Sequence, residues 1–93
     1  MRIPMHPGKL LKEEIEARQI SASKLAAALD VPANRISEII RGRRAITAET
    51  ALRLARYFGN SPEFWLNLQT KHDLGKANAE QGAYIRQTVK TAA

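Results

Sequence analysis

Apolar residues recur at intervals of three and four along most of this chain, which is the period of an amphipathic α-helix. The pattern predicts five helices, over about residues 7–19, 22–29, 33–41, 48–58 and 62–77. We find no run of alternating apolar and polar residues long enough to predict a strand. The chain is therefore expected to be all-α, with five helices in one domain.

Side chains suited to helix ends flank the predicted segments. Hydroxyl groups that can cap the first turn of a helix stand at Ser21, Thr47 and Ser61. Glycines that can end a helix in the left-handed conformation stand at Gly42 and Gly59. The boundaries of the middle helices are thus predicted by local chemistry as well as by periodicity.

The second and third predicted helices have the arrangement of a helix-turn-helix motif. Asp30 lies where the chain must turn between them, and aspartate tolerates the left-handed conformation better than most residues. Ile36 and Ile39 face back toward Leu25 at helical spacing, so the two helices share a buried side. The other side of the third helix is polar and followed by arginines, which suits entry into a DNA major groove.

This polar edge predicts contacts with both bases and phosphates. Asn34 can offer a paired donor and acceptor to adenine, whereas Arg35 can read guanine or clamp a phosphate. Phosphates would repel Glu38, which is useful only if it accepts a hydrogen bond from cytosine. The predicted base contacts are Ala33, Asn34, Arg35, Ser37 and Glu38. The predicted phosphate contacts are Ser23, Arg41, Arg43 and Arg44. The alternative for each is a solvated polar surface.

Composition supports the same class of partner. The 93 residues suffice for one small domain, and the net charge of +6 favours a polyanionic ligand. There is no cysteine, which excludes disulfides and thiolate metal sites, and we expect neither metal nor cofactor. We find no apolar run long enough to cross a membrane and no apolar signal core, so a cytoplasmic location is expected.

The sequence gives little support to an enzyme. His6 and His72 are the only histidines and lie far apart in the chain, and no glycine-rich phosphate loop or metal-ligand spacing is present. We therefore expect no catalytic residues.

Two further surfaces are candidate protein contacts. A single helix-turn-helix covers one half-site, so an operator reader needs a second copy. The fifth predicted helix is apolar over a wide arc, and we expect Phe64, Trp65 and Leu68 to contact that copy, the alternative being burial in the core. The first helix carries an acidic group at Glu13, Glu14 and Glu16, which is either a partner surface or a solvated face.

Three motifs in this order resemble the HigA family of antitoxins. They are His6-Pro7-Gly8 followed by Leu11, IIRGRRAIT at residues 39–47 and SPEFWLNLQ at residues 61–69. The five helices likewise resemble a lambda-repressor-like (XRE-type) DNA-binding domain. The resemblance implies a homodimer that binds a palindromic operator and represses its own operon.

The same resemblance implies a protein partner. HigA-family antitoxins neutralise a RelE-like toxin that cleaves messenger RNA, and the acidic group at residues 13–16 is our candidate contact with such a basic ribonuclease. A stand-alone XRE-type repressor without a toxin is the alternative function, because it would use the same DNA-binding residues.

The regular pattern fades after Asn78, where small and polar residues dominate. We therefore predict a DNA-binding and dimerisation domain over residues 1–77 and a separate C-terminal segment over residues 78–93. A short helix and disorder are both compatible with that segment, and we favour a poorly ordered tail.

Overall fold

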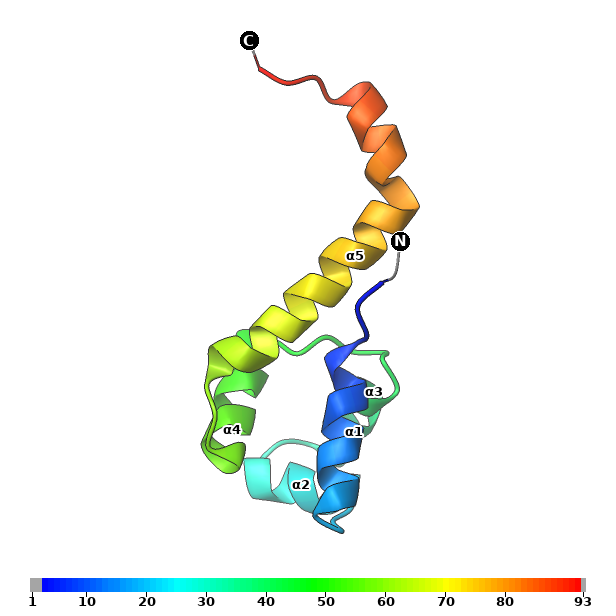
Figure 1. Ribbon diagram of the computed structural model, residues 1–93. Coiled ribbons are helices and arrows are strands. Elements are labelled where there is room, and N and C mark those ends of the chain that lie inside the picture. Colours follow the sequence, from blue (N-terminus) through cyan, green and yellow to red (C-terminus); the bar gives the residue numbers. More distant parts are fainter. Residues whose placement is uncertain (1–2, 93) are drawn as a thin grey trace.

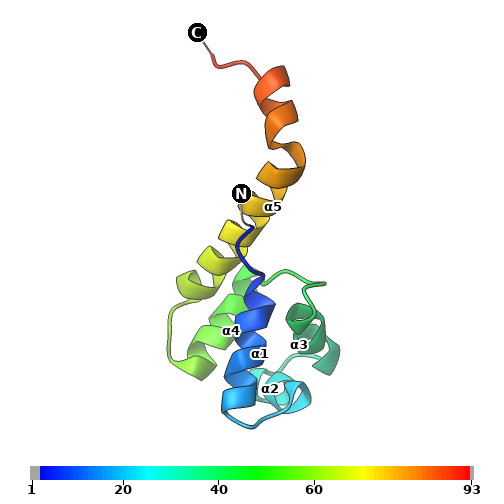
Figure 2. The ribbon, with the colours of Figure 1, turned by 45° about the vertical axis from the view of Figure 1, so that its right-hand side comes forward.

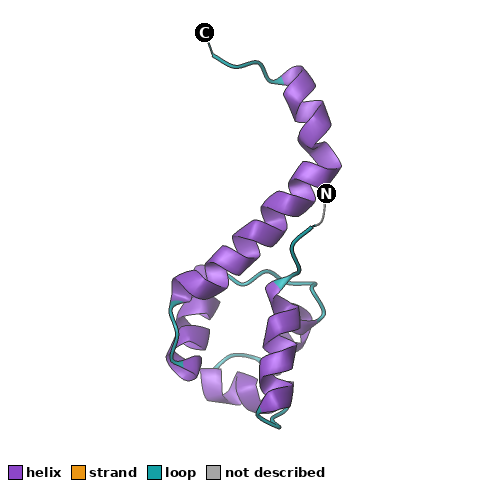
Figure 3. Cartoon of the chain, in the orientation of Figure 1, coloured by secondary structure: helices purple, strands orange, loops and turns teal. Residues whose placement is uncertain are grey.

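The computed structural model describes residues 3–92, and this part of the chain folds into helices joined by short loops (Figures 1 and 3). The elements are α1 (Pro7–Ala17), α2 (Ala22–Leu29), α3 (Ala33–Ile40), α4 (Ala48–Phe58) and α5 (Pro62–Thr88). The described residues contain no strand. The prediction of an all-α, five-helix fold is confirmed.

Local capping fixes the starts of three helices. The hydroxyl oxygen of Ser21 accepts a hydrogen bond from the Lys24 N–H at 3.0 Å, and Ser61 accepts one from Phe64 at 3.1 Å. Thr47 caps α4 in the same way. Each bond satisfies one of the amide groups that a helix start leaves without an intrahelical partner.

Left-handed residues end two of the helices. Asp30 has φ 60° at the end of α2, and Gly59 has φ 75° at the end of α4. Gly42, two residues beyond α3, has φ 74°. The predicted turn at Asp30 is confirmed, and it sets the angle at which α3 leaves α2.

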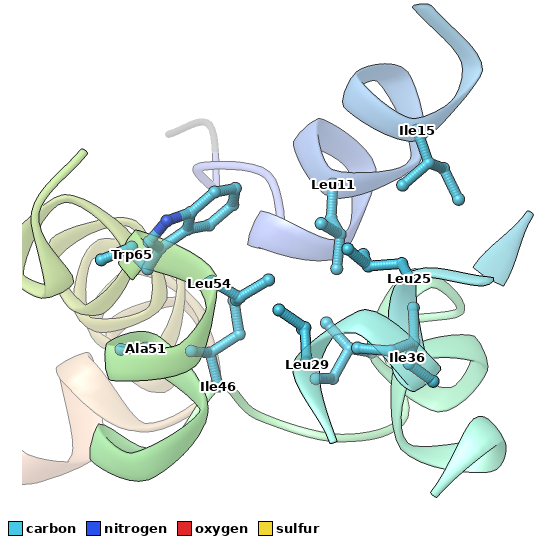
Figure 4. Close-up of a cluster of buried hydrophobic side chains, with 12 residues drawn as sticks. Leu11, Ile15, Leu25, Leu29, Ile36, Ile46, Ala51, Leu54 and Trp65 are labelled. Carbon is cyan, nitrogen blue, oxygen red and sulfur yellow. The ribbon is translucent and has the colours of Figure 1, made fainter. Parts of the chain in front are cut away.

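The core lies between α1, α2, α3, α4 and the first turns of α5 (Figure 4). Leu11, Leu25, Ile36 and Leu54 are fully buried there, together with Trp65 at 1% exposure. Because Ile36 and Leu25 pack into one cluster, α2 and α3 are fixed against each other. The opposite side of α3 is left at the surface.

Helix α5 is longer than its sequence predicts. It runs to Thr88, so the expected end near residue 77 and the poorly ordered tail are wrong for the residues that the structure describes. Figures 1 and 2 show its second half projecting away from the other helices. That half is rich in alanine, glutamine and other good helix formers, which sustain a helix without the apolar periodicity that sequence reading depends on.

The segment before α1 is attached to α5. The Nδ1 atom of His72 lies 2.7 Å from the Pro4 carbonyl oxygen. Gly75 follows on the same helix, and a Cβ there would stand 2.5 Å from Cδ of Pro4. The absence of a side chain at residue 75 therefore lets the N-terminal segment lie against α5.

Candidate nucleic-acid interface

The surface side of α3, which we call the reading edge, carries the predicted base contacts at residues 33–35, 37 and 38. Ala33 and Asn34 are exposed at the start of the helix, and Arg35, Ser37 and Glu38 are half-buried behind them. The Ser37 hydroxyl donates to the Asn34 carbonyl oxygen at 3.2 Å, so its proton is engaged within the helix. The structure thus gives the freest access to Ala33 and Asn34, where a recognition helix first meets base edges.

Arg35 is restrained by an acid that sequence reasoning did not connect with it. Its Nη1 atom donates to Glu49 Oε1 at 3.3 Å, and its side chain is 27% exposed. Glu49 lies in the first turn of α4, so the ion pair joins the recognition helix to the next helix. No spacing rule could have found this contact, because it depends on how the loop between α3 and α4 folds.

Glu38 is paired with Arg44. The carboxylate oxygen Oε1 accepts hydrogen bonds from Nη2 at 2.7 Å and from Nε at 3.0 Å. The predicted cytosine contact of Glu38 would need this pair to open. The ion pair also holds the Arg44 guanidinium beside the reading edge, where its charge offsets that of the glutamate.

A hollow of about 220 Å³ lies between these two ion pairs. Its lining residues are Arg35, Arg44, Ala45, Thr47, Glu49 and Thr50. Two guanidinium groups, hydroxyls and the first turn of α4 give it the chemistry of a phosphate-backbone contact, although Glu49 opposes an anion there.

The remaining predicted phosphate contacts are at the surface. Arg41 and Arg43 are exposed between α3 and α4, and Ser23 is exposed in the first turn of α2. Ser21, rather than Ser23, provides the cap of that helix. Ser23 is therefore not needed to cap α2, and its contact with DNA stays a prediction.

Trp65 does not lie on a dimer surface. Its side chain is 1% exposed within a single chain, and its Nε1 donates to Asn60 Oδ1 at 3.0 Å. The prediction that Trp65 contacts a second copy is wrong, because α5 turns this residue into the core. Phe64 is 42% exposed and Leu68 is half-buried, so both retain surface for a partner.

The distal half of α5 carries apolar side chains that the fold leaves uncovered. Leu74 is 66% exposed and Ile85 is 48% exposed. Their spacing of eleven residues places them on one side of the helix. Val89, 66% exposed, follows the end of the helix in an extended conformation. The exposed stripe of Leu74 and Ile85 is a candidate protein contact that the sequence analysis did not identify, because we expected the helix to end near residue 77, before Ile85.

The acidic group on α1 is partly engaged within the chain. Glu13 and Glu16 are exposed, whereas Glu14 forms an ion pair with Arg18. The Arg18 guanidinium also lies 4.8 Å from the centre of the Phe58 ring. Two of the three carboxylates are thus free of this pair and accessible to a basic partner.

Both histidines have structural roles. The His6 Nδ1 atom accepts from the Gly8 N–H at 2.9 Å and caps α1, and its ring lies 5.1 Å from that of His72. Burial, followed by the nearby His72, lowers the pKa of His6 from its ordinary value of 6.5. Among residues 3–92 we find no cluster of three potential metal ligands.

No helix in the described part of the chain is both long and apolar enough to span a bilayer.

The residues of this interface lie within a region that is similar to known proteins. The helix-turn-helix family model matches residues 11–65, which include α2 and α3 and the loop between α3 and α4. The structure of an addiction module antidote protein of the HigA family from Coxiella burnetii is similar, with a TM-score of 0.92 and 47% identity, covering 99% of this chain and 100% of that one.

Two further HigA antitoxins are similar to this chain. The Pseudomonas aeruginosa antitoxin HigA, solved with the higBA promoter, has a TM-score of 0.92 and 40% identity, covering 97% of this chain and 99% of that one. Antitoxin HigA-1 from Vibrio cholerae serotype O1 is 43% identical over 74 residues, which are 78% of this chain and 70% of the relative. The similarity therefore extends over the whole of the reading edge and its supporting helices.

Proposed function

The chain belongs to the HigA family of XRE-type helix-turn-helix antitoxins, and on this basis we propose its function. It neutralises a RelE-like toxin that cleaves messenger RNA by binding the toxin directly. It also represses its own operon by binding a palindromic operator as a homodimer. Both activities take place in the cytoplasm, where operator DNA and translating ribosomes are accessible.

The observation that carries DNA binding is the arrangement of charge around α3. Asn34 is exposed at the start of the helix, and Arg41 and Arg43 are exposed just after its end. Amide groups suit base edges and guanidinium groups suit phosphates, so one docked helix can satisfy both. The promoter complex of the Pseudomonas aeruginosa relative supports this mode of binding.

Dimerisation uses the exposed side of α5. Phe64 near its start and the stripe of Leu74 and Ile85 farther along are apolar groups that the single chain leaves in water. A second copy that packs its own α5 on this side would cover them, and a two-fold arrangement presents two recognition helices to two half-sites. Helix-turn-helix dimers bind half-sites about 34 Å apart, one turn of DNA, and we expect that spacing in the operator.

Toxin binding is assigned to the acidic side of α1. Glu13 and Glu16 project into solvent, and a ribonuclease that binds RNA is cationic as a rule. Glu14 could join the contact by exchanging Arg18 for a toxin side chain. This surface lies on a different helix from the reading edge, so toxin and operator could be bound by separate parts of the chain.

Growth rescue tests the proposal. Cells express the short open reading frame that adjoins this gene, with and without the full-length chain, and the two products are then purified together. We expect growth arrest that the chain relieves, a stable complex, and binding of the chain to DNA from its own promoter. A Glu13→Lys, Glu16→Lys variant should lose rescue and keep promoter binding.

The opposite variant separates the two activities. Asn34→Ala combined with Arg35→Ala should lose specific promoter binding, while helical content and growth rescue are retained. If the neighbouring product is harmless, or if the chain cannot relieve its toxicity, the antitoxin role is rejected. Promoter binding without rescue would then indicate a stand-alone repressor.

A further inference from the structure

One carboxylate oxygen lies between two arginines beside the reading edge. Glu49 Oε1 is 3.3 Å from Arg35 Nη1 and 3.7 Å from Arg53 Nε. Arg35 belongs to the first turn of α3, whereas Glu49 and Arg53 are one turn apart on α4. A single oxygen therefore connects the recognition helix to α4 through side chains alone.

Arg53 is itself held by α2. Its Nη1 atom donates to the carbonyl oxygen of Leu29 at 2.9 Å, and Leu29 is the last residue of α2. Carbonyls in the last turn of a helix lack an intrahelical partner, so this bond satisfies one of them. The series Leu29, Arg53, Glu49 and Arg35 thus spans α2, α4 and α3, and it ends on a residue of the reading edge.

The pairing restrains Arg35 without using up its donors. A guanidinium group has five N–H donors, and the contact with Glu49 uses one nitrogen. The remaining donors are available for a bidentate contact with guanine or with a phosphate. Because the side chain is already held in one position, it loses less conformational freedom when it binds DNA.

Glu49 also places a negative charge beside the DNA-facing hollow. Its side chain is 65% exposed and lines the same hollow as Arg35 and Arg44. A carboxylate at this point repels phosphates of any sequence, so it weakens binding to unrelated DNA. On the operator, a base contact made by the correctly placed Arg35 offsets that repulsion.

We propose that Glu49 is a positioning residue that determines the specificity of operator recognition by holding Arg35 in its reading position. The inference rests on the proposed function, since it assumes that α3 reads DNA. It adds a residue outside the helix-turn-helix itself to the determinants of specificity. Arg53 supports Glu49 by fixing it relative to α2.

A simpler role for Glu49 would be stabilisation of α4. An acid in the first turn interacts favourably with the helix dipole, and Glu49 is the second residue after the Thr47 cap. The chain offers a matched control, because Glu63 is the second residue after the Ser61 cap of α5. Glu63→Gln removes the same charge from the same helical position without involving Arg35.

The test measures binding of the full-length chain to two labelled duplexes of equal length, one from its own promoter and one with the promoter bases scrambled. Fluorescence anisotropy is recorded at several salt concentrations for the wild type, Glu49→Gln, Glu49→Asp, Glu63→Gln, Arg35→Ala and the Arg35→Ala, Glu49→Gln double variant. Circular dichroism confirms that each variant remains folded.

We expect Glu49→Gln to bind the scrambled duplex about three- to tenfold more tightly than the wild type does. The ratio of its affinity for the promoter to its affinity for the scrambled duplex should fall about tenfold. Glu49→Asp keeps the charge and should retain part of the ratio. Glu63→Gln should match the wild type. With Arg35 already replaced by alanine, Glu49→Gln should leave the ratio unchanged.

Two results would overturn the inference while the proposed function stands. The first is that Glu49→Gln has the same promoter-to-scrambled affinity ratio as the wild type. The second is an equal loss of ratio with and without Arg35, which would mean that Glu49 affects specificity independently of Arg35. If the wild-type chain binds the promoter no better than the scrambled duplex, specific DNA recognition fails and this inference fails with it.

Discussion

Gly8 lies so close to the main chain of Ile39 that a Cβ at residue 8 would stand 1.8 Å from the Ile39 carbonyl oxygen. Gly8 is in the first turn of α1, and Ile39 is in the last turn of α3. Both residues are buried. The recognition helix is therefore supported from behind by a backbone contact that only glycine permits.

Gly8→Ala should for this reason destabilise the protein. The carbonyl belongs to a packed helix and cannot move aside freely, so we expect a loss of about 2–3 kcal/mol in the free energy of unfolding. Urea denaturation measures it. Gly75→Ala is the comparison, because its Cβ would meet the Pro4 ring at 2.5 Å in an exposed N-terminal segment that can shift. Equal losses in the two variants would contradict the explanation.

Gln69 links α5 to the residue before the α4 cap. Its side-chain oxygen accepts from the buried Ile46 N–H at 2.9 Å, and its amide nitrogen donates to Asp73 at 3.0 Å. Gln69→Leu leaves the Ile46 N–H without this acceptor, so we expect a loss of about 1–3 kcal/mol in the free energy of unfolding. Gln81→Leu changes an exposed glutamine of the same helix and should change stability by no more than about 0.5 kcal/mol.

Protonation of His6 should destabilise the fold. Burial and the nearby His72 lower its pKa below 6.5, despite opposing contributions from Asp73 and a hydrogen bond with the Arg44 backbone. Below pH 6.5 the unfolded chain therefore binds more protons than the folded one. The stabilising contribution of neutral His6 is fully present above pH 6.5. It declines as the pH falls toward the lowered pKa that His6 has in the folded chain.

His6→Asn should reduce that pH dependence. Asparagine is a good helix cap and does not titrate, so it can replace the acceptor for the Gly8 N–H. Urea denaturation at a series of pH values between about 5 and 8 should show a flatter decline in stability for the variant than for the wild type. An unchanged slope would mean that protonation of His6 does not cause the decline.

The apolar stripe on α5 predicts how the proposed dimer can be broken. Leu74→Glu places a charge on the stripe and should shift the chain from dimer to monomer in light scattering, with its helical content retained. Ala79→Glu adds the same charge five residues on, which is the other side of the helix, and should leave the dimer intact. A monomeric wild type, or a dimeric Leu74→Glu variant, would exclude this surface as the interface.

Local chemistry accounts for the parts of the fold that the sequence predicts well. Ser21 caps α2 through a bond to a residue three positions away, and Asp30 takes its left-handed conformation from the turn itself. Such features need no knowledge of the tertiary structure. The order of α2 and α3, and hence the residues of the reading edge, follows from them.

Long-range contacts were not predictable in the same way. Arg35 and Glu49 are fourteen residues apart and meet only because α4 returns beside α3. Trp65 and Phe64 are neighbouring aromatic residues, and only the direction of α5 decides that one is buried and the other exposed. Helix continuation beyond residue 77 depended on propensity in a segment that has little apolar periodicity.

Arg43 and Arg44, two of the three arginines that follow α3, should contribute differently to DNA binding. Arg43→Ala removes an exposed cation, so we expect promoter and scrambled DNA to bind about three- to tenfold more weakly, with a smaller salt dependence. Arg44→Ala removes a cation and also exposes the carboxylate of Glu38, which Arg44 neutralises through two hydrogen bonds. Arg44→Ala should therefore lose more DNA affinity than Arg43→Ala does.

Adding Glu38→Gln to Arg44→Ala tests this explanation, since it removes the charge that the missing arginine leaves unpaired. The double variant should recover part of the affinity and approach Arg43→Ala in anisotropy titrations. Arg86→Ala, in the projecting part of α5, is the control and should bind as the wild type does. If Glu38→Gln gives no recovery, the Arg44 side chain acts only through its own contact with phosphate, and the ion pair has no role in tuning the reading edge.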